Sequence, residues 1–222
     1  MNAIINTKLF YLQEMLGVLN CHHQEKGLLK GGLDPRIAAY ITDAGLDRLH
    51  RVPNIDLDHA LITMLVERWR PETHSFHLPH GEMTITLQDM EVIMGVPVDG
   101  LPVVGFTHMD DWGDLLLNRQ VGAGKNTAVM EGPRVKAKWL EERFSNPFPA
   151  DATKELVQKY ARFYILEMLA GILLMDKSGE RHSIMYLQVF NPISNGKKYS
   201  WGSAALSWLY RHFYKALEKT TK

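Results

Sequence analysis

Apolar residues recur every three or four positions along several stretches of the chain, which is the spacing of an amphipathic helix. The first such stretch begins at Asp34, a favourable N-cap residue that is followed by proline, and ends at Gly45. Its apolar positions are Ile37, Tyr40, Ile41 and Ala44. The pattern therefore predicts a helix between Asp34 and Gly45.

The same spacing predicts further helices at about residues 56–69, 135–145, 152–175 and 201–218. The inward stripe of the helix at 56–69 is expected to consist of Leu57, Leu61, Met64, Leu65 and Trp69. The inward positions expected in the last helix are Leu206, Leu209, Phe213 and Leu217, and Ser200 suits its N-cap. Another short helix is expected to follow Thr86, which has the spacing of a capping box with Asp89, and to end at Gly95.

Residues 69–82, WRPETHSFHLPHGE, interrupt the helical spacing. We expect Pro71 to end the preceding helix, because the residue before a proline is disfavoured in the helical conformation. Apolar and polar residues then alternate on either side of His80 and Gly81, which predicts two short strands joined by a turn. The expected fold is mainly α: a single helical domain with a small β-hairpin near residues 74–86. Residues 106–135 carry no clear pattern.

The composition is that of an ordinary globular protein, since 45% of the 222 residues are apolar and 23% are charged. The formal net charge is zero, which disfavours tight binding to the phosphates of nucleic acid. The single cysteine, Cys21, cannot form an internal disulfide and favours a reducing compartment. The N-terminus lacks the pattern of a secretory signal, and the most apolar run, 163–175, is too short to cross a membrane. We therefore expect a protein that is neither secreted nor embedded in a membrane.

Three histidines, His74, His77 and His80, stand three positions apart and suggest a metal site, because zinc commonly binds imidazole nitrogens. Side chains alternate along a strand, so His77 is expected to point away from the face that His74 and His80 share. Imidazoles that stabilise the hairpin are therefore the favoured interpretation. A metal site, and with it a metal-dependent enzyme, stays open as an alternative.

The remaining candidate chemistry is weak. The run VGAGKNT, residues 121–127, lacks the first glycine and the Ser or Thr of a phosphate-binding loop, since Arg119 and Asn126 stand there. No G-x-S-x-G sequence occurs, and the paired carboxylates are adjacent in the chain, where side chains do not face one another. The sequence therefore predicts no catalytic residue, no cofactor and no enzymatic activity.

Aromatic and basic residues mingle in GKKYSWGSAALSWLYRHFYK, residues 196–215, and such mixtures can hold single-stranded nucleic acid. The inward face of a helix explains most of the aromatic positions equally well. A domain that binds nucleic acid is thus an alternative function.

Residues 57–103 form a long ordered block that resembles the plant mobile domain, also called the aminotransferase-like plant mobile domain. The blocks at 160–187 and 199–213 resemble later parts of the same family, which includes the maintenance-of-meristems proteins and the long form of a plant serine/threonine phosphatase. The resemblance covers about residues 33–215. Its structural signature consists of Trp69, Arg70, Pro71, His77, Pro79, Gly81, Thr86, Asp89, Gly95 and Trp201.

The resemblance implies a non-enzymatic, transposon-related nuclear domain that acts in meristem maintenance, transposon silencing and genome stability. Nuclear protein partners are expected, self-association and nucleic acid are further partners to test, and a cytoplasmic location is the alternative to the nucleus. The name aminotransferase-like implies a pyridoxal cofactor, but no signature for its Schiff-base lysine is present. Family members often carry cysteine where His80 stands, which makes a role that only histidine can fill a poor fit.

The expected organisation is an N-terminal lead at residues 1–33, a partial plant mobile domain at 34–218 and a tail at 219–222. Family members usually continue well beyond the last helix, so the sequence predicts a C-terminally truncated copy. A decayed copy without a selected function is the remaining alternative. Truncation would leave apolar surface uncovered and favour a partner or self-association.

Overall fold

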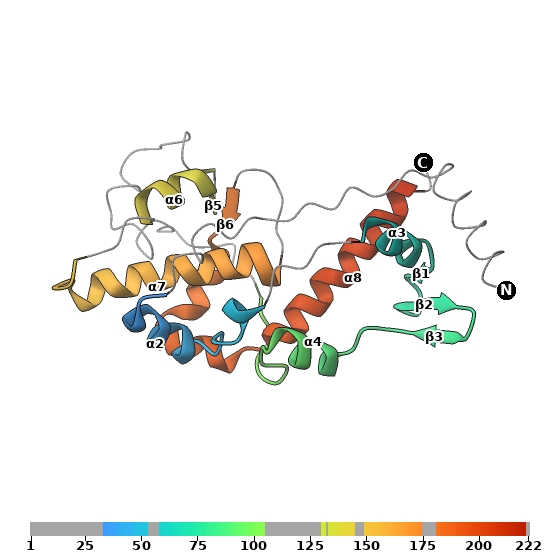
Figure 1. Ribbon diagram of the computed structural model, residues 1–222, viewed down its shortest axis with the longest axis horizontal. Helices are drawn as coiled ribbons and strands as arrows, with labels where there is room; N and C mark the ends of the chain where they lie inside the picture. The colour runs from blue at the N-terminus through green and yellow to red at the C-terminus, as the bar shows by residue number, and fades with distance from the viewer. Residues whose placement is uncertain are drawn as a thin grey trace. The chain divides into compact units, whose positions relative to one another are not determined.

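The computed structural model describes residues 33–52, 58–104, 130–131, 133–144, 149–174 and 181–220. These residues are mainly helical and include two small antiparallel sheets, β1-β2-β3 and β4-β5-β6 (Figure 1). Their contacts divide the chain into two compact units. The first unit contains Pro53–Thr86 and Leu206–Lys222, and the second contains Gln24–Val52 and Leu87–Ala205. The predicted mainly α fold with a small hairpin is confirmed.

Helix α2, Pro35–Asp43, begins where the sequence predicts it. The carboxylate of Asp34 accepts a hydrogen bond of 2.8 Å from the backbone N–H of Arg36, which satisfies a donor that the first turn leaves free. Ile37 and Ile41 are buried, and α2 packs against α7 within the second unit (Figure 1). The helical spacing of the apolar residues therefore identified the buried face correctly.

The core of the second unit surrounds helix α7, Lys154–Met168. Thr153 caps this helix by accepting a hydrogen bond from the backbone N–H of Leu156. The helix then widens into a π-helical turn, Leu169–Leu173, which the predicted helix at 152–175 did not anticipate. Apolar side chains that are at most 1% exposed fill this core, among them Leu46, Leu49, Leu140, Phe163, Ile165, Leu166, Leu187, Phe190 and Trp201.

The helix predicted at residues 135–145 is shorter than expected. Helix α6 is Ala137–Phe144, because Arg134–Lys136 forms strand β5 and pairs with β6, Arg181–Ser183. Strand β4, Met130–Glu131, adds to the same sheet. Two 3₁₀ helices follow β6, Met185–Phe190 and Ile193–Lys198. Strands β5 and β6 are about 50 positions apart in the chain, and each is too short to leave a periodic signal in the sequence.

The predicted helix at 56–69 was wrong in its C-terminal boundary and in its inward face. Helix α3 is His59–Glu67, with Asp58 as its N-cap, and Thr63 and Val66 are its buried positions. Leu61, which was expected to face inward, is 50% exposed. Trp69 belongs to strand β1, Trp69–Arg70, because its backbone pairs with Phe76. This pairing takes the chain out of the helix before it reaches Pro71.

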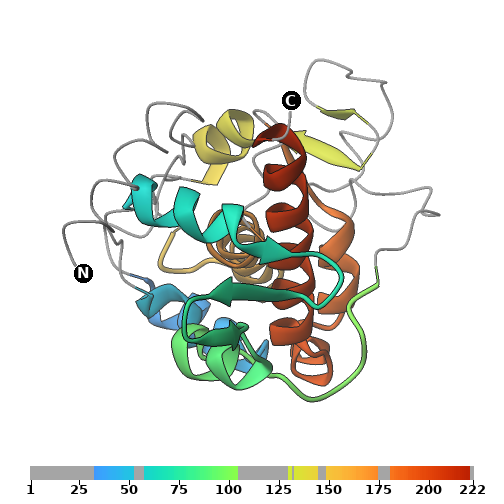
Figure 2. The same cartoon turned by 90° about the vertical axis from the view of Figure 1, so that its right-hand side faces the viewer.

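The hairpin consists of β2, Ser75–Leu78, and β3, Gly81–Met83, with Pro79 and His80 in the turn. Figure 2 shows the two strands as adjoining antiparallel arrows. Strand β1 completes the sheet by pairing with β2. The sequence predicted the hairpin but not this third strand.

Helix α4, Leu87–Met94, begins directly after Thr86 and ends at Gly95, as the sequence predicted. Only Met90 is buried along it, whereas Val92 and Ile93 are 83% and 68% exposed. The capping box of Thr86 and Asp89 stays a prediction. Helix α8 is Trp201–Thr220, close to the predicted 201–218. Among the described residues, no helix is long and apolar enough to cross a membrane.

Several predictions concern residues outside the described parts of the chain. They include the N-terminal lead with Cys21, most of the segment 106–135 with its phosphate-loop-like run, and the last two residues. The boundary that separates a single domain at 34–218 from its lead and tail therefore stays a prediction.

Candidate functional site

Trp69 lies at the centre of an aromatic cluster in the first unit. Its ring centroid lies 5.0 Å from that of Phe76, 5.0 Å from that of Tyr210 and 4.9 Å from that of Phe213. Phe76 and Phe213 also meet edge to face at 5.3 Å. The side chain of Trp69 is fully buried. Aromatic pairs at these separations add stability beyond the area that they bury, so Trp69 joins the sheet to helix α8.

The local sequence explains how these rings converge. Trp69 and Phe76 are paired residues of β1 and β2, so their side chains lie on the same face of the sheet. Tyr210 and Phe213 are three positions apart on α8 and share one face of that helix. The helical spacing of residues 206–217 therefore predicted that Phe213 faces inward, but it could not identify the strand residues as its partners.

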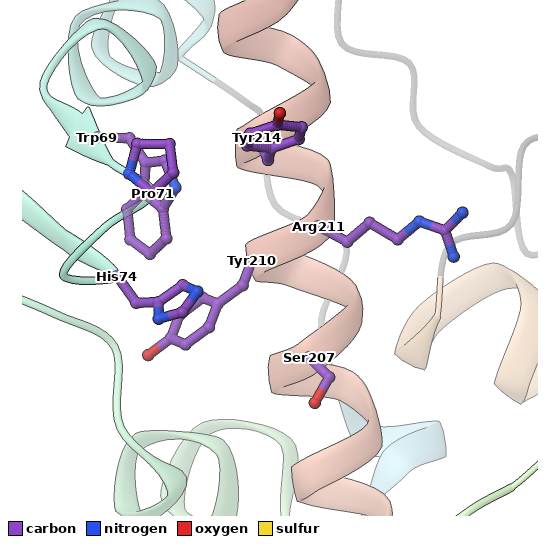
Figure 3. A pocket seen from close by; sticks show the side chains of 7 residues that line it. All are labelled: Trp69, Pro71, His74, Ser207, Tyr210, Arg211 and Tyr214. Atoms are coloured by element: carbon purple, nitrogen blue, oxygen red, sulfur yellow. The ribbon is translucent and has the colours of Figure 1, made fainter.

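His74 has an unusual backbone conformation, with φ at +50°. Its imidazole ring stacks on the ring of Tyr210, with the centroids 5.2 Å apart and the planes 9° from parallel (Figure 3). The hydroxyl of Thr84 donates to the His74 carbonyl, and the hydroxyl of Tyr210 donates to the Ile85 carbonyl at 2.6 Å. The imidazole of His74 is thus part of the contact between the turn and α8.

The other two histidines lie elsewhere on the hairpin. His77 points from β2 toward Glu82, its partner on β3, with 3.1 Å between Nε2 and the carboxylate Oε1. The second carboxylate oxygen of Glu82 accepts a hydrogen bond of 3.1 Å from the Ser75 hydroxyl. His80 is exposed in the turn. Glu82 therefore links the half-exposed His77 and the buried Ser75 across the hairpin.

The described residues contain no group of three or more His, Cys, Asp or Glu side chains that could hold a metal ion. His74, His77 and His80 are accordingly not brought together. The alternation of side chains along a strand does not determine where His74 and His80 point. His74 precedes β2 and has a positive φ, and His80 lies in the turn. His74 contacts Tyr210 and His77 contacts Glu82, and the interpretation of the three histidines as scaffold residues stays a prediction.

A cavity of about 570 Å³ opens beside the aromatic cluster. Trp69, Pro71 and His74 line it from the strands and turn. Ser207, Tyr210, Arg211 and Tyr214 line it from α8; Tyr210 lies toward His74, whereas the Arg211 side chain extends away from the hairpin (Figure 3). Its volume lies within the range of about 300–1,000 Å³ that is typical of ligand sites. We refer to it as the aromatic cavity.

Trp69 and Arg211 carry hydrogen-bond donors only, whereas Ser207, Tyr210, Tyr214 and His74 can donate and accept. Among the described residues, no Asp or Glu lines the aromatic cavity. The indole N–H of Trp69 is buried and has no acceptor among the described residues, although buried polar groups are usually paired. Tyr214 is 48% exposed, and Arg211 lies at the edge with its side chain directed away from the hairpin in Figure 3. The accessible lining is therefore aromatic and apolar with a few polar groups of both kinds.

Comparison with known protein families decides the identity of the chain. The family model of the plant mobile domain matches residues 45–222. The chain belongs to the plant mobile domain family. No solved structure matches it.

Three relatives from Arabidopsis thaliana are similar to most of this plant mobile domain. A serine/threonine-protein phosphatase 7 long form homolog is 40% identical and covers 91% of the chain. Protein MAIN-LIKE 2 is 36% identical over 88% of it, and Protein MAINTENANCE OF MERISTEMS is 35% identical over 92% of it. The matched part is 15%, 29% and 42% of these relatives, so the chain spans less than half of each.

Several residues of the predicted signature have a specific contact or backbone conformation in this plant mobile domain. Trp69 and Pro71 line the aromatic cavity, and Gly81 and Gly95 have φ values of +128° and +64° that other residues rarely adopt. The indole N–H of Trp201 donates to the Gly196 carbonyl at 3.0 Å, and its ring stacks on Phe190 at 5.2 Å. Sequence reasoning missed Tyr210, Tyr214 and Arg211 as lining residues, because each is an ordinary residue of an amphipathic helix.

A second chemical feature of the plant mobile domain lies in the core of the second unit. The Glu167 carboxylate lies 3.4 Å from Nε2 of His182, and both side chains are largely buried. Burial, with a smaller contribution from Glu141, raises the pKa of Glu167 to about 8. The carboxyl is therefore mostly protonated at neutral pH. Glu167 stands next to the π-helical turn, and such turns are frequent at functional sites.

Proposed function

We propose that the chain is a non-enzymatic interaction domain of a plant nuclear protein and that it acts in meristem maintenance and transposon silencing. The name of the relative Protein MAINTENANCE OF MERISTEMS supports the first of these roles. Silencing and the nuclear location rest on the family resemblance. The partners we propose are nuclear proteins, and self-association is the second mode, which the exposed Val92 and Ile93 of helix α4 support.

The observation that carries the proposal is the aromatic cavity. A concave surface with aromatic walls and a few polar groups is the usual form of a binding site, and tyrosine, tryptophan and arginine are the residues that contribute most to protein interfaces. Tyr214 and Arg211 supply such groups at the rim.

Affinity purification from plant meristem nuclei tests the proposal. The full chain, tagged at one end, is used as bait. The bound proteins are compared with those recovered by the same tagged chain after heat denaturation. We expect a reproducible set of nuclear proteins that includes regulators of meristem or transposon genes. Recovery of the same proteins by both baits would contradict the proposal.

A fluorescent fusion of the full chain, expressed in plant cells, tests the location separately. We expect accumulation in the nucleus when the chain is expressed together with a recovered partner. Exclusion from the nucleus in the presence of that partner would count against a nuclear role.

The alternative is a nucleic-acid-binding domain. The basic and aromatic lining of the aromatic cavity favours it, since single-stranded nucleic acid stacks on aromatic rings next to cationic groups. The zero net charge of the chain favours the protein-interaction role instead.

A further inference from the structure

We propose that the buried contact between Glu167 and His182 is a pH-sensitive switch, which holds one proton while strand β6 lies against helix α7 and releases it when the two elements separate. The inference goes beyond the proposed interaction role and does not depend on it. Its support comes from the geometry of the contact, from the charges around it and from the number of protons that each state binds.

The contact lies on the buried face of the β4-β5-β6 sheet. His182 pairs with Val135 of β5, so both side chains lie on the same face, and they are 2% and 0% exposed. Nε2 of the imidazole lies 3.4 Å from Oε1 of Glu167, at the C-terminal end of α7 next to β6 (Figure 1). The neighbours Leu166 and Met168 are each 1% exposed. Two groups that can carry a charge are thus enclosed by apolar side chains.

The charges of α6 and β6 do not compensate an ionised Glu167. Glu141 on α6 carries a negative charge that opposes the ionisation of Glu167. Arg181 alternates with His182 along β6 and so points to the opposite face, where its guanidinium lies 3.5 Å from the Glu131 carboxylate. An ionised Glu167 beside a neutral His182 would therefore leave a net negative charge in the core.

Helix α7 also packs against α2, the π-helical turn and the 3₁₀ helix that follows β6. The π-helical turn has no titratable side chain, and the 3₁₀ helix has Tyr186. The charged residues of α2 are Arg36 and Asp43, and Tyr164 stands one turn before Glu167 on α7 itself. The raised pKa of Glu167 reflects burial and the charge on α6.

The folded contact holds one proton over a wide range of pH. A buried pair of a carboxyl and an imidazole has no net charge when the two groups share one proton, and any other number of protons leaves a charge in the core. Burial raises the pKa of Glu167 to about 8, so the pair keeps its proton up to about that pH.

Once β6 has separated from α7, water reaches both groups and they titrate as in the unfolded chain. The imidazole then binds a proton below about pH 6.5, and the carboxyl binds one below about pH 4.5. Between these values the separated groups also hold one proton, so pH does not change the equilibrium. Above about pH 6.5 they hold none, so each pH unit up to about 8 favours separation about tenfold.

Chemical modification of His182 measures the separation, because the imidazole is 2% exposed in the folded state. Its rate of reaction with diethyl pyrocarbonate is divided by the rate in the urea-unfolded chain at the same pH, which removes the effect of pH on the reagent and on the free imidazole. We expect this ratio to stay constant up to about pH 6.5 and then to rise about tenfold per pH unit until about pH 8. A ratio that stays constant over the whole range would overturn the proposal.

The variant Glu167→Gln tests whether the carboxyl carries the proton. The amide has nearly the same size and releases no proton, so the rise above about pH 6.5 should disappear. Below that pH the separated imidazole still binds a proton, so the ratio should now rise as the pH falls. A variant that keeps the wild-type rise would overturn the assignment to Glu167.

Two exposed carboxylates of α6 provide a matched pair of variants that leave the core intact. Glu141→Gln removes the charge that helps to raise the pKa of Glu167, so the ratio should level off at a lower pH than in the wild type. Glu142→Gln removes the neighbouring charge and should leave that pH unchanged. Equal shifts in both variants would show that the net charge of the protein sets the pH dependence, which would overturn the switch even if Glu167→Gln does not fold.

Hydrogen exchange of helix α2 separates local opening from unfolding of the whole second unit. The backbone amides of the buried Ile37 and Ile41 exchange only when that helix opens. At each pH we expect His182 to become accessible at least about tenfold more often than these amides, because separation of β6 is the smaller opening. Equal frequencies would show that only unfolding exposes His182, and the switch would be overturned.

Discussion

At the scale of single residues, Trp69 holds the sheet of the first unit against α8 through three aromatic contacts. We expect Trp69→Ala to lower the free energy of unfolding by about 3–5 kcal/mol, because it leaves a cavity in the cluster. Trp69→Phe keeps one ring and should cost less. Urea denaturation followed by circular dichroism measures both variants.

A matched control for Trp69 is Val92→Ala, which truncates a side chain that is 83% exposed. Surface substitutions of this kind usually change the stability by no more than about 0.5 kcal/mol. Equal unfolding midpoints for Trp69→Ala and Val92→Ala would show that the cluster does not stabilise the fold.

Glu167 makes the stability depend on pH. Its pKa rises from 4.5 to about 8 on folding, so the folded state retains a proton that the unfolded chain releases above pH 4.5. The contribution to stability is therefore complete below about pH 4.5 and is lost as the pH rises to about 8. The loss can reach about 1.4 kcal/mol per pH unit.

The measurement compares the wild type with Glu167→Gln in urea denaturation from pH 5 to pH 8. The amide keeps the size of the side chain and does not titrate, and the subtraction removes the effect of other groups, apart from any change in His182, the imidazole that faces Glu167. We expect the stability of the wild type relative to the variant to fall steadily with pH. A difference that stays constant would show that Glu167 titrates normally.

At the scale of elements, two glycines terminate α4 and shape the hairpin for different reasons. Gly95 has a φ of +64°, and a Cβ there would lie 2.5 Å from Cβ of Arg48. Gly81 has a φ of +128°, and a Cβ there would meet no atom within 4 Å. Strain in the backbone therefore acts at both positions, and a steric clash acts only at Gly95.

We expect Gly95→Ala to destabilise the protein more than Gly81→Ala. Each substitution should cost about 1–3 kcal/mol for the disfavoured φ, and the clash with Arg48 adds to the cost at Gly95. Replacing Arg48 by alanine does not remove its Cβ, so the double variant should recover only the part of the clash that comes from Cδ, at 2.7 Å. A larger cost at Gly81 would contradict this explanation. Thermal and urea unfolding of the three variants measure these differences.

At the scale of the whole molecule, the balance of 25 Lys and Arg against 25 Asp and Glu limits binding to nucleic acid. We expect the affinity for single-stranded and double-stranded oligonucleotides to be no tighter than about 10⁻⁴–10⁻⁶ M at physiological salt, which is the range of nonspecific binding. A salt titration followed by anisotropy measures it. Binding tighter than this range at physiological salt, which weakens as the salt concentration rises, would favour the nucleic-acid alternative over the interaction domain.

The chain by itself determined the helices whose signals are local. The helical spacing of apolar residues identifies α2, the start of α7 and almost all of α8, and the cap at Asp34 also identifies the start of α2, because both signals depend on neighbours within one or two turns. The cap expected at Ser200 stays a prediction. The turn residues of the hairpin are equally local. The resemblance of residues 57–103 to the plant mobile domain also depends on sequence order alone, and the family match confirms it.

The tertiary structure decided which side chains meet. Trp69 continues the apolar spacing of α3, yet it belongs to β1, because pairing with Phe76 and contact with Tyr210 and Phe213 bury its ring. The same contacts place His74 on Tyr210 and separate it from His77 and His80. The strand and turn residues of the aromatic cavity lie more than 100 positions from their partners on α8, and such a distance leaves no periodic signal, so the cavity could be found only from the folded protein. The buried pair of Glu167 and His182 joins α7 to β6, and this contact leaves no periodic signal either.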